Sequence, residues 1–163
     1  MRGPIRISDL PFNSEEIWCE VLTMASHRRA ALFLDRDGVV VEDKEYLWRK
    51  EDIVMIPGAA GAIAAANNCG IAVVLVTNQA VIGRGYYGWT KFRAVQRTIV
   101  GALAADGARF DGVYACAHLP EEIGGFAHPD HPTLKPNPGM LLQAARVLGL
   151  DLKKLMAHRR QSD

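Results

Sequence analysis

The sequence is poor in cysteine and in long apolar runs. Its three cysteines are scattered along 163 residues, and this odd, irregular set argues against a disulfide framework and favours a reducing compartment. No stretch approaches the roughly 18 consecutive apolar residues of a membrane-spanning helix, and the amino terminus lacks a signal-peptide pattern. These absences predict a cytoplasmic protein without a membrane segment.

Net charge is small as well. Nineteen basic and 18 acidic residues leave a formal charge of +1, so the chain has no excess of positive charge for nucleic acid or for an anionic membrane surface. We therefore expect neither as a partner. The length suits one domain that buries about 68–70% of its unfolded surface, and no pattern indicates an oligomeric state.

The most informative feature that is present is an apolar run ending in two acidic residues. Residues 30–34 read Ala-Ala-Leu-Phe-Leu and are followed by Asp35, Arg36, Asp37 and Gly38. Such a run predicts a buried strand, and ligand sites of open α/β sheets lie beyond the carboxyl ends of strands. Since residues i and i+2 of an extended chain point the same way, both carboxylates should face one reacting group.

Strands and helices alternate along the rest of the chain. Further strands are expected at 71–76, at 111–116 and from 155 onward, and helices at 57–68, 90–105 and 138–148. This alternation predicts an α/β fold, a mostly parallel sheet with helices on both faces. Residues 1–29 read as an N-terminal extension with at most one short helix, over 14–25, and residues 30–163 as the folded domain.

Polar residues recur just after predicted strands or just before predicted helices. Thr77 and Asn78 follow the second strand of this pattern, and Lys135 precedes the last helix. Alone, Thr77 would be read as a helix cap and Lys135 as a surface charge. Together with Asp35 and Asp37 they supply a nucleophile, a proton donor, phosphate ligands and a cation, which is what phosphoryl transfer requires. Oxygen ligands around a phosphate fit Mg²⁺.

Three motifs resemble those of the haloacid dehalogenase-like phosphatases. They are Asp35-x-Asp37-Gly38-Val39, Val76-Thr77-Asn78-Gln79 with Ile82-x-Arg84-Gly85, and Lys135-Pro136-x-Pro138-Gly139-Met140. Over about residues 30–163 the chain is most similar to the group of histidinol-phosphate and D,D-heptose 1,7-bisphosphate phosphatases. The resemblance implies a Rossmann-like sheet, Mg²⁺ dependence and hydrolysis of a small phosphomonoester through an aspartyl-phosphate.

The resemblance also assigns roles to individual residues. It implies catalysis by Asp35, Asp37 and Lys135. It implies phosphate or substrate binding by Thr77 and Asn78, with Arg84 as a candidate on the substrate loop. The Mg²⁺ ligands it implies are Asp35, Asp37 and Asp163.

The chain departs from the family at its fourth motif, roughly Gly-Asp-x-x-x-Asp, whose first Asp binds Mg²⁺. Residues 157–163 read Ala-His-Arg-Arg-Gln-Ser-Asp. If Asp163 is the second acid, Arg159 replaces the first; an ungapped alignment from Lys135 places Arg160 there instead. Since a cation repels Mg²⁺, we expect weakened metal binding unless Asp163 or water compensates. Relatives continue with a helix and a strand, so we expect an incomplete sheet edge.

A second departure concerns zinc. Many members of the group carry Cys-x-His followed by Cys-x-Cys, and this chain has Cys116-x-His118 followed by His131-x-Thr133. Cys116, His118, His128 and His131 would offer four nitrogen or sulfur ligands. Their irregular spacing is equally typical of ordinary loop residues, so Zn²⁺ stays an alternative.

Several functions remain open at this point. Leu134 stands where the family has a substrate-binding Arg, which weakens the heptose bisphosphate assignment because a guanidinium is a good clamp for a second phosphate. The first expectation is a phosphatase acting on a small sugar phosphate, such as D-glycero-D-manno-heptose 1,7-bisphosphate, or on histidinol phosphate. The alternatives are an impaired or truncated relative that binds phosphorylated ligands, and a phosphate-transferring mutase.

Overall fold

The computed structural model describes residues 17–120 and 124–158. Their centre is a five-stranded sheet in the order β1-β4-β3-β2-β5. The strands are β1 (Ile17–Val21), β2 (Arg29–Leu34), β3 (Ala72–Asn78), β4 (Gly112–Cys116) and β5 (Leu150–His158). All pairings are parallel except that of β1 with β4.

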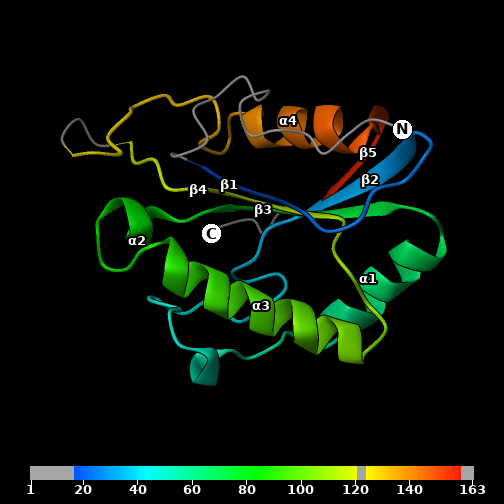
Figure 1. Cartoon of the computed structure of the whole chain (residues 1–163), viewed down its shortest axis with the longest axis horizontal. Helices are drawn as coiled ribbons and strands as arrows, with labels where there is room; N and C mark the ends of the chain where they lie inside the picture. Colours follow the sequence, from blue (N-terminus) through cyan, green and yellow to red (C-terminus); the bar gives the residue numbers. More distant parts are fainter. Residues whose placement is uncertain (1–16, 121–123, 159–163) are drawn as a thin grey trace.

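Helices cover both faces of this sheet, as predicted. Figure 1 shows α4 on one face and α1 and α3 on the other. The helices are α1 (Ala59–Asn68), α2 (Ala80–Gly83), α3 (Trp89–Ala105) and α4 (Gly139–Leu148), with a short 3₁₀ turn at Lys50–Asp52. The three longer helices confirm the sequence prediction within two residues at their starts. The single turn of α2 was not predicted.

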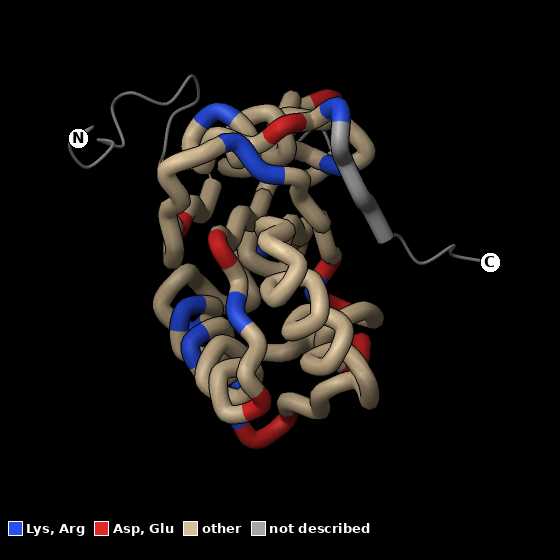
Figure 2. The backbone as a smooth tube through the Cα atoms, turned by 90° about the vertical axis from the view of Figure 1, so that its right-hand side faces the viewer, with Lys and Arg blue, Asp and Glu red and all other residues tan. Residues whose placement is uncertain are grey.

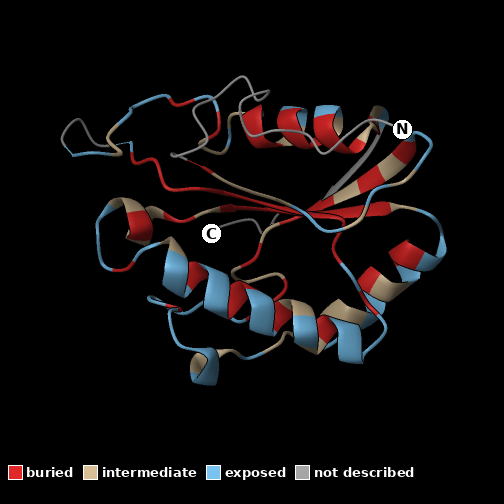
Figure 3. Ribbon diagram, in the orientation of Figure 1, coloured by how far each residue is buried: buried red, intermediate tan, exposed pale blue. Residues whose placement is uncertain are grey.

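The central strands are buried on both sides. Residues Val73, Val74 and Leu75 of β3 are fully inaccessible, which explains why this strand reads as a continuous apolar run rather than an alternating one. On α3, the inward-facing residues Phe92 and Val95 are fully buried too. Figure 3 shows the same division for every longer helix, with buried residues toward the sheet and exposed residues outward.

The helix expected over residues 14–25 is wrong for the described part of that segment. Residues Ile17–Val21 form β1 instead, paired antiparallel with β4 from Ile17↔Cys116 to Val21↔Gly112. The pairing satisfies the backbone along one edge of β4, and Trp18 packs against the rings of Trp89 and Phe92 at 5.8 and 5.5 Å. The division into residues 1–29 and 30–163 stays a prediction.

Strand β5 begins earlier than predicted, at Leu150 directly after the α4 stop at Gly149. It runs parallel to β2, with a register shift between Arg29 and Ala31, and ends with His158 level with Leu34. In the described part of the chain β5 is an edge strand. Its carboxyl end lies beside the strand that leads to Asp35.

The described residues carry charges of both signs, as the net charge of +1 implies. Basic and acidic residues are interspersed along the backbone tube in Figure 2. Within 17–120 and 124–158, none of the helices has the length and apolar content needed to cross a membrane.

Candidate active site

The two acidic residues lie where the sequence predicts, just beyond the carboxyl end of β2. Asp35 follows Leu34, and one of its carboxylate oxygens, Oδ1, accepts the Arg36 backbone N–H at 2.8 Å. The chain then turns at Gly38, whose φ of 81° is in the left-handed region that favours glycine. The Gly38 N–H donates to the Val41 carbonyl at 2.8 Å, closing the turn.

A cavity of about 520 Å³ opens at this edge of the sheet. It brings together Asp35, Asp37, Asn78 and Lys135, which come from three separate stretches of the chain. Asp43, from the loop after β2, lines the same cavity. The remaining lining is more apolar and comprises Phe33, Val76, Pro136, Asn137, Pro138 and Leu141.

Lys135 and Asp35 form an ion pair in this cavity. The Lys135 Nζ lies 2.7 Å from Asp35 Oδ2, with side chains 23% and 35% exposed. The same ammonium donates to the Val76 carbonyl at 3.2 Å. Lys135 therefore places a positive charge directly beside the carboxylate predicted to be the nucleophile.

Asn78 fixes the backbone of Lys135. Its Oδ1 accepts the Lys135 N–H at 3.1 Å, and its Nδ2 donates to the Lys135 carbonyl at 3.2 Å. The Lys135–Pro136 peptide bond is cis. The sequence predicts that Asn78 binds substrate. In this structure both polar atoms of its side-chain amide are hydrogen-bonded to the backbone of Lys135.

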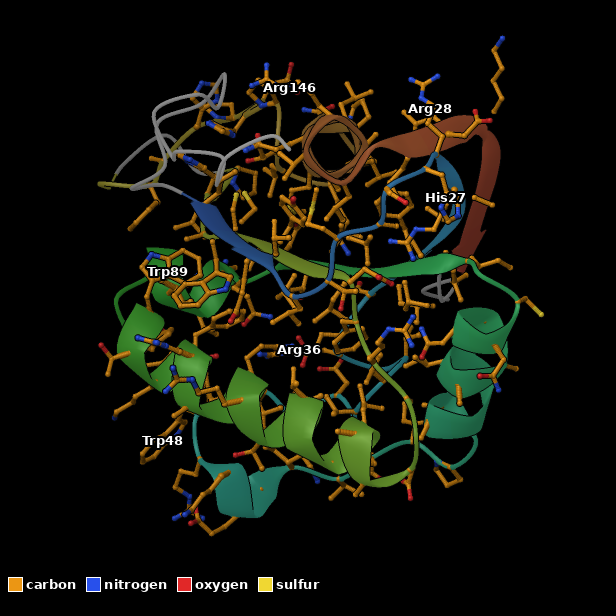
Figure 4. The ribbon with its side chains drawn as sticks, turned by 45° about the vertical axis from the view of Figure 1, so that its right-hand side comes forward. His27, Arg28, Arg36, Trp48, Trp89 and Arg146 are labelled. Carbon is orange, nitrogen blue, oxygen red and sulfur yellow. The ribbon has the colours of Figure 1, made fainter. Side chains whose placement is uncertain are left out.

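Asp37 is held by two residues that the sequence analysis missed. Arg36 donates to both of its oxygens, Nε to Oδ1 at 3.0 Å and Nη2 to Oδ2 at 3.2 Å. Gln79 Nε2 donates to Oδ2 at 3.0 Å. Arg36 is 1% exposed, with its guanidinium 5.5 Å from the Phe92 ring centre. Figure 4 shows it in the interior, between the sheet and α3.

The other two predicted substrate-binding residues lie outside the cavity lining. Thr77 is fully buried, and its hydroxyl accepts a hydrogen bond from Gln79 Nε2 at 2.9 Å. Arg84 is exposed at the end of α2. Their roles stay predictions.

The candidate zinc residues cluster without forming a metal site. The rings of His118 and His131 stack at 3.6 Å and 11°, and His128 lies edge-on to His131 at 5.0 Å. Cys116 Sγ accepts a hydrogen bond from the Thr133 hydroxyl at 3.3 Å. Over residues 17–120 and 124–158, no three His, Cys, Asp or Glu residues are arranged to hold a metal ion. The zinc alternative is therefore not supported.

The oxygen donors at the cavity fit the chemistry of Mg²⁺. Asp35 and Asp37 present carboxylates to it, and Mg²⁺ is usually bound by one or two carboxylates together with substrate phosphate and water. Asp163, Arg159 and Arg160 lie outside the described residues.

Comparison with known proteins places the chain in a family. No family model matches it. It is 48% identical over 124 residues to D-glycero-beta-D-manno-heptose-1,7-bisphosphate 7-phosphatase of Mesorhizobium japonicum, a match covering 76% of this chain and 57% of the relative. It is 40% identical over 137 residues to D-glycero-alpha-D-manno-heptose-1,7-bisphosphate 7-phosphatase of Burkholderia mallei, a match covering 83% of this chain and 72% of the relative. The chain thus spans little more than half the length of the first relative.

Solved structures similar to this chain are phosphatases as well. A haloacid dehalogenase-like phosphatase of Mesorhizobium loti superposes with a TM-score of 0.84 at 42% identity, covering 91% of this chain and 72% of the other. D,D-heptose 1,7-bisphosphate phosphatase of B. bronchiseptica, complexed with magnesium and phosphate, superposes with a TM-score of 0.64 at 31% identity. This match covers 76% of this chain and 65% of the other. The chain therefore belongs to the haloacid dehalogenase-like phosphatases, in the subgroup of the heptose 1,7-bisphosphate phosphatases.

Proposed function

We propose that this chain is a Mg²⁺-dependent phosphatase that hydrolyses a small sugar phosphate, D-glycero-D-manno-heptose 1,7-bisphosphate or a close analogue, in the cytoplasm. The observation that carries the proposal is the ion pair of 2.7 Å between Lys135 Nζ and Asp35 Oδ2, in a cavity that Asp37 also lines. The names of the relatives supply the substrate class. The cavity volume lies within the range of small-molecule sites.

In the first chemical step a carboxylate oxygen of Asp35 bonds to phosphorus while the bond from phosphorus to the sugar oxygen breaks. Asp37 donates its proton to that departing oxygen, so the sugar leaves as an alcohol. In the second step Asp37 takes a proton from water, the water oxygen bonds to phosphorus, and inorganic phosphate leaves Asp35. Lys135 offsets negative charge around Asp35 throughout.

The metal and the substrate would be held by the residues implied by the family motifs. Asp35 and Asp163 are proposed as carboxylate ligands of Mg²⁺, and Asp37 as a ligand that leaves its carboxyl group able to carry a proton. Bound Mg²⁺ would neutralise charge on the phosphate and the nucleophile. Thr77, Asn78 and Arg84 are the proposed substrate-binding residues.

A second candidate is a relative that binds phosphorylated ligands without turnover. The sequence favours it at one place, because Arg159 or Arg160 stands where the family has a metal-binding Asp. Leu134, in place of a substrate-binding Arg, removes a clamp for a second phosphate.

The test is phosphate release from a panel of sugar phosphates, including heptose bisphosphate and histidinol phosphate, with and without Mg²⁺. We expect Mg²⁺-dependent turnover that Asp35→Asn abolishes. Binding of phosphorylated ligands by folded protein with no turnover above that variant would instead support the second candidate. Transfer of labelled phosphate to another sugar phosphate, rather than to water, would indicate a mutase.

A further inference from the structure

Gln79, between β3 and α2, uses its entire hydrogen-bonding capacity inside the protein. It is 3% exposed. Its Nε2 donates to Asp37 Oδ2 at 3.0 Å and to Thr77 Oγ1 at 2.9 Å. Its Oε1 accepts from Arg36 Nη2 at 3.2 Å and from the Tyr87 hydroxyl at 3.5 Å. A primary amide has two donors and two acceptor sites, so every one of them has a partner.

The nitrogen end of this amide joins two groups of the proposed reaction. Asp37 follows β2, Thr77 belongs to β3, and one NH₂ group contacts both. The separation between the proton-transferring carboxylate and the proposed phosphate-binding hydroxyl is therefore set by Gln79 rather than by the strands alone.

The partners of Gln79 Oε1 fix the orientation of the amide group. The Arg36 guanidinium can only donate hydrogen bonds. It donates one to Gln79 Oε1 and two to the Asp37 carboxylate. Rotation of the amide by 180° would bring N–H against guanidinium N–H and the amide oxygen against a carboxylate oxygen. Burial raises the pKa of Tyr87, so its hydroxyl keeps its proton and remains a donor. A fully satisfied buried network of this kind is rigid.

We propose that Gln79 is a positioning residue for proton transfer by Asp37. The inference rests on the phosphatase function proposed above and names a residue that the family resemblance did not assign to the site. Gln79 is buried and is not among the residues that line the cavity. It orients Asp37 so that its proton reaches the departing sugar oxygen as the phosphorus–oxygen bond breaks, and so that Asp37 can later take a proton from the attacking water.

This role predicts a dependence on the leaving group that a purely structural role does not. A sugar alkoxide is a poor leaving group and needs the proton, whereas p-nitrophenolate departs without one. Since kcat/KM reports the steps up to departure of the leaving group, misplacing Asp37 should lower kcat/KM for a sugar phosphate far more than for p-nitrophenyl phosphate. General loosening of the site would lower both equally.

The experiment compares Gln79→Glu and Gln79→Met with wild type and with Asp37→Asn. Gln79→Glu keeps the shape and the acceptor facing Arg36 and Tyr87 but places an oxygen against Asp37; Gln79→Met removes all four hydrogen bonds. The matched control is Gln96→Met on α3. Gln96 is equally buried and lies outside the cavity lining, and its amide has no hydrogen-bond partner in the described residues. Thermal unfolding checks that each variant is folded.

We expect both Gln79 variants to lose about 100-fold in kcat/KM on the sugar phosphate and less than about 10-fold on p-nitrophenyl phosphate, the pattern of Asp37→Asn. Gln96→Met should match wild type on both. Equal losses on the two substrates, or no loss, would overturn the role of Gln79 while leaving the phosphatase proposal intact. A wild-type chain inactive on both substrates would overturn the phosphatase proposal and this role with it.

Discussion

Asn78 binds the backbone of Lys135 in the same two-bond arrangement by which Asn67 binds the backbone of Arg109. In the first pair the amide accepts the Lys135 N–H at 3.1 Å and donates to its carbonyl at 3.2 Å. In the second the corresponding distances to Arg109 are 2.9 and 3.1 Å. Only the first pair lies at the cavity. The fold thus contains two chemically equivalent bridges, and one of them holds Lys135, the cation of the proposed active site.

This equivalence separates stability from activity. We predict that Asn78→Ala and Asn67→Ala each lower the free energy of unfolding by about 1–3 kcal/mol, because each removes two hydrogen bonds and leaves partly buried backbone groups unpaired. Only Asn78→Ala should also lower phosphate release per folded molecule, since Lys135 loses its anchor. Denaturant unfolding and steady-state turnover measure the two effects. A similar loss of turnover in Asn67→Ala would contradict the assignment.

Removing the ammonium of Lys135 should affect chemistry far more than stability. Its pair with Asp35 is partly exposed, and exposed ion pairs contribute about 0–1 kcal/mol. A positive charge 2.7 Å from Asp35, the proposed nucleophile, is worth more in the transition state, so we predict a loss of about 100-fold or more in kcat for Lys135→Met.

The control for that prediction is Arg49→Met, which removes an exposed pair with Asp52 at 2.9 Å on the surface. It should leave both turnover and the unfolding temperature nearly unchanged. Lys135→Arg should not restore activity, because a planar guanidinium is larger than an ammonium and cannot place one compact charge at the same point. Full activity in Lys135→Arg would show that charge alone matters.

Gly139 holds the loop that carries Lys135 against the start of α4. A Cβ at this position would lie 2.3 Å from the Pro132 carbonyl oxygen, a backbone atom that moves only with its loop. We therefore predict that Gly139→Ala lowers both the unfolding temperature and turnover. Gly101→Ala is the matched control: Gly101 lies within α3 with open space around it, so alanine should stabilise the protein by about 0.5–1 kcal/mol. Wild-type turnover in Gly139→Ala would mean that the Lys135 loop tolerates displacement.

The sequence predicts well those features that depend on local pattern. The buried strands β2 and β3 and the helix α3 are recognisable because apolar runs and helical spacing report burial directly. The meeting of Asp35 with Asn78 follows from the rule that parallel strands end at one edge, and Asn78 in turn holds the backbone of Lys135 there. The heptose bisphosphate phosphatase subgroup, read from three short motifs, agrees with the relatives.

Features that depend on distant partners were not predicted. β1 is a strand because β4, far along the chain, offers it an edge, and five residues of weak pattern do not reveal that partner. Gln79 stands in one of the three motifs, but the sequence gives it no role, because that role depends on Asp37 and Arg36 being placed around it. Local sequence specifies which residues reach the edge of the sheet, whereas side-chain direction is decided by contacts between segments.

The three cysteines should respond to thiol reagents according to burial. Cys69 is exposed, whereas burial raises the pKa of the Cys19 thiol to about 12 and Cys116 is fully buried beside Thr133. We predict that one thiol reacts rapidly with an aromatic disulfide reagent at pH 8 in the native protein, that all three react after unfolding, and that Cys69→Ser removes the rapid phase.

The raised pKa of Cys19 also sets the direction in which stability changes with pH. The folded state retains the Cys19 proton above the ordinary thiol pKa of 9.0, where the unfolded chain loses it, so this contribution to stability is complete below about pH 9 and declines as pH rises toward 12. Cys19→Ala should flatten that decline in denaturant unfolding, and rapid reaction of Cys19 at pH 8 in the folded protein would refute the prediction.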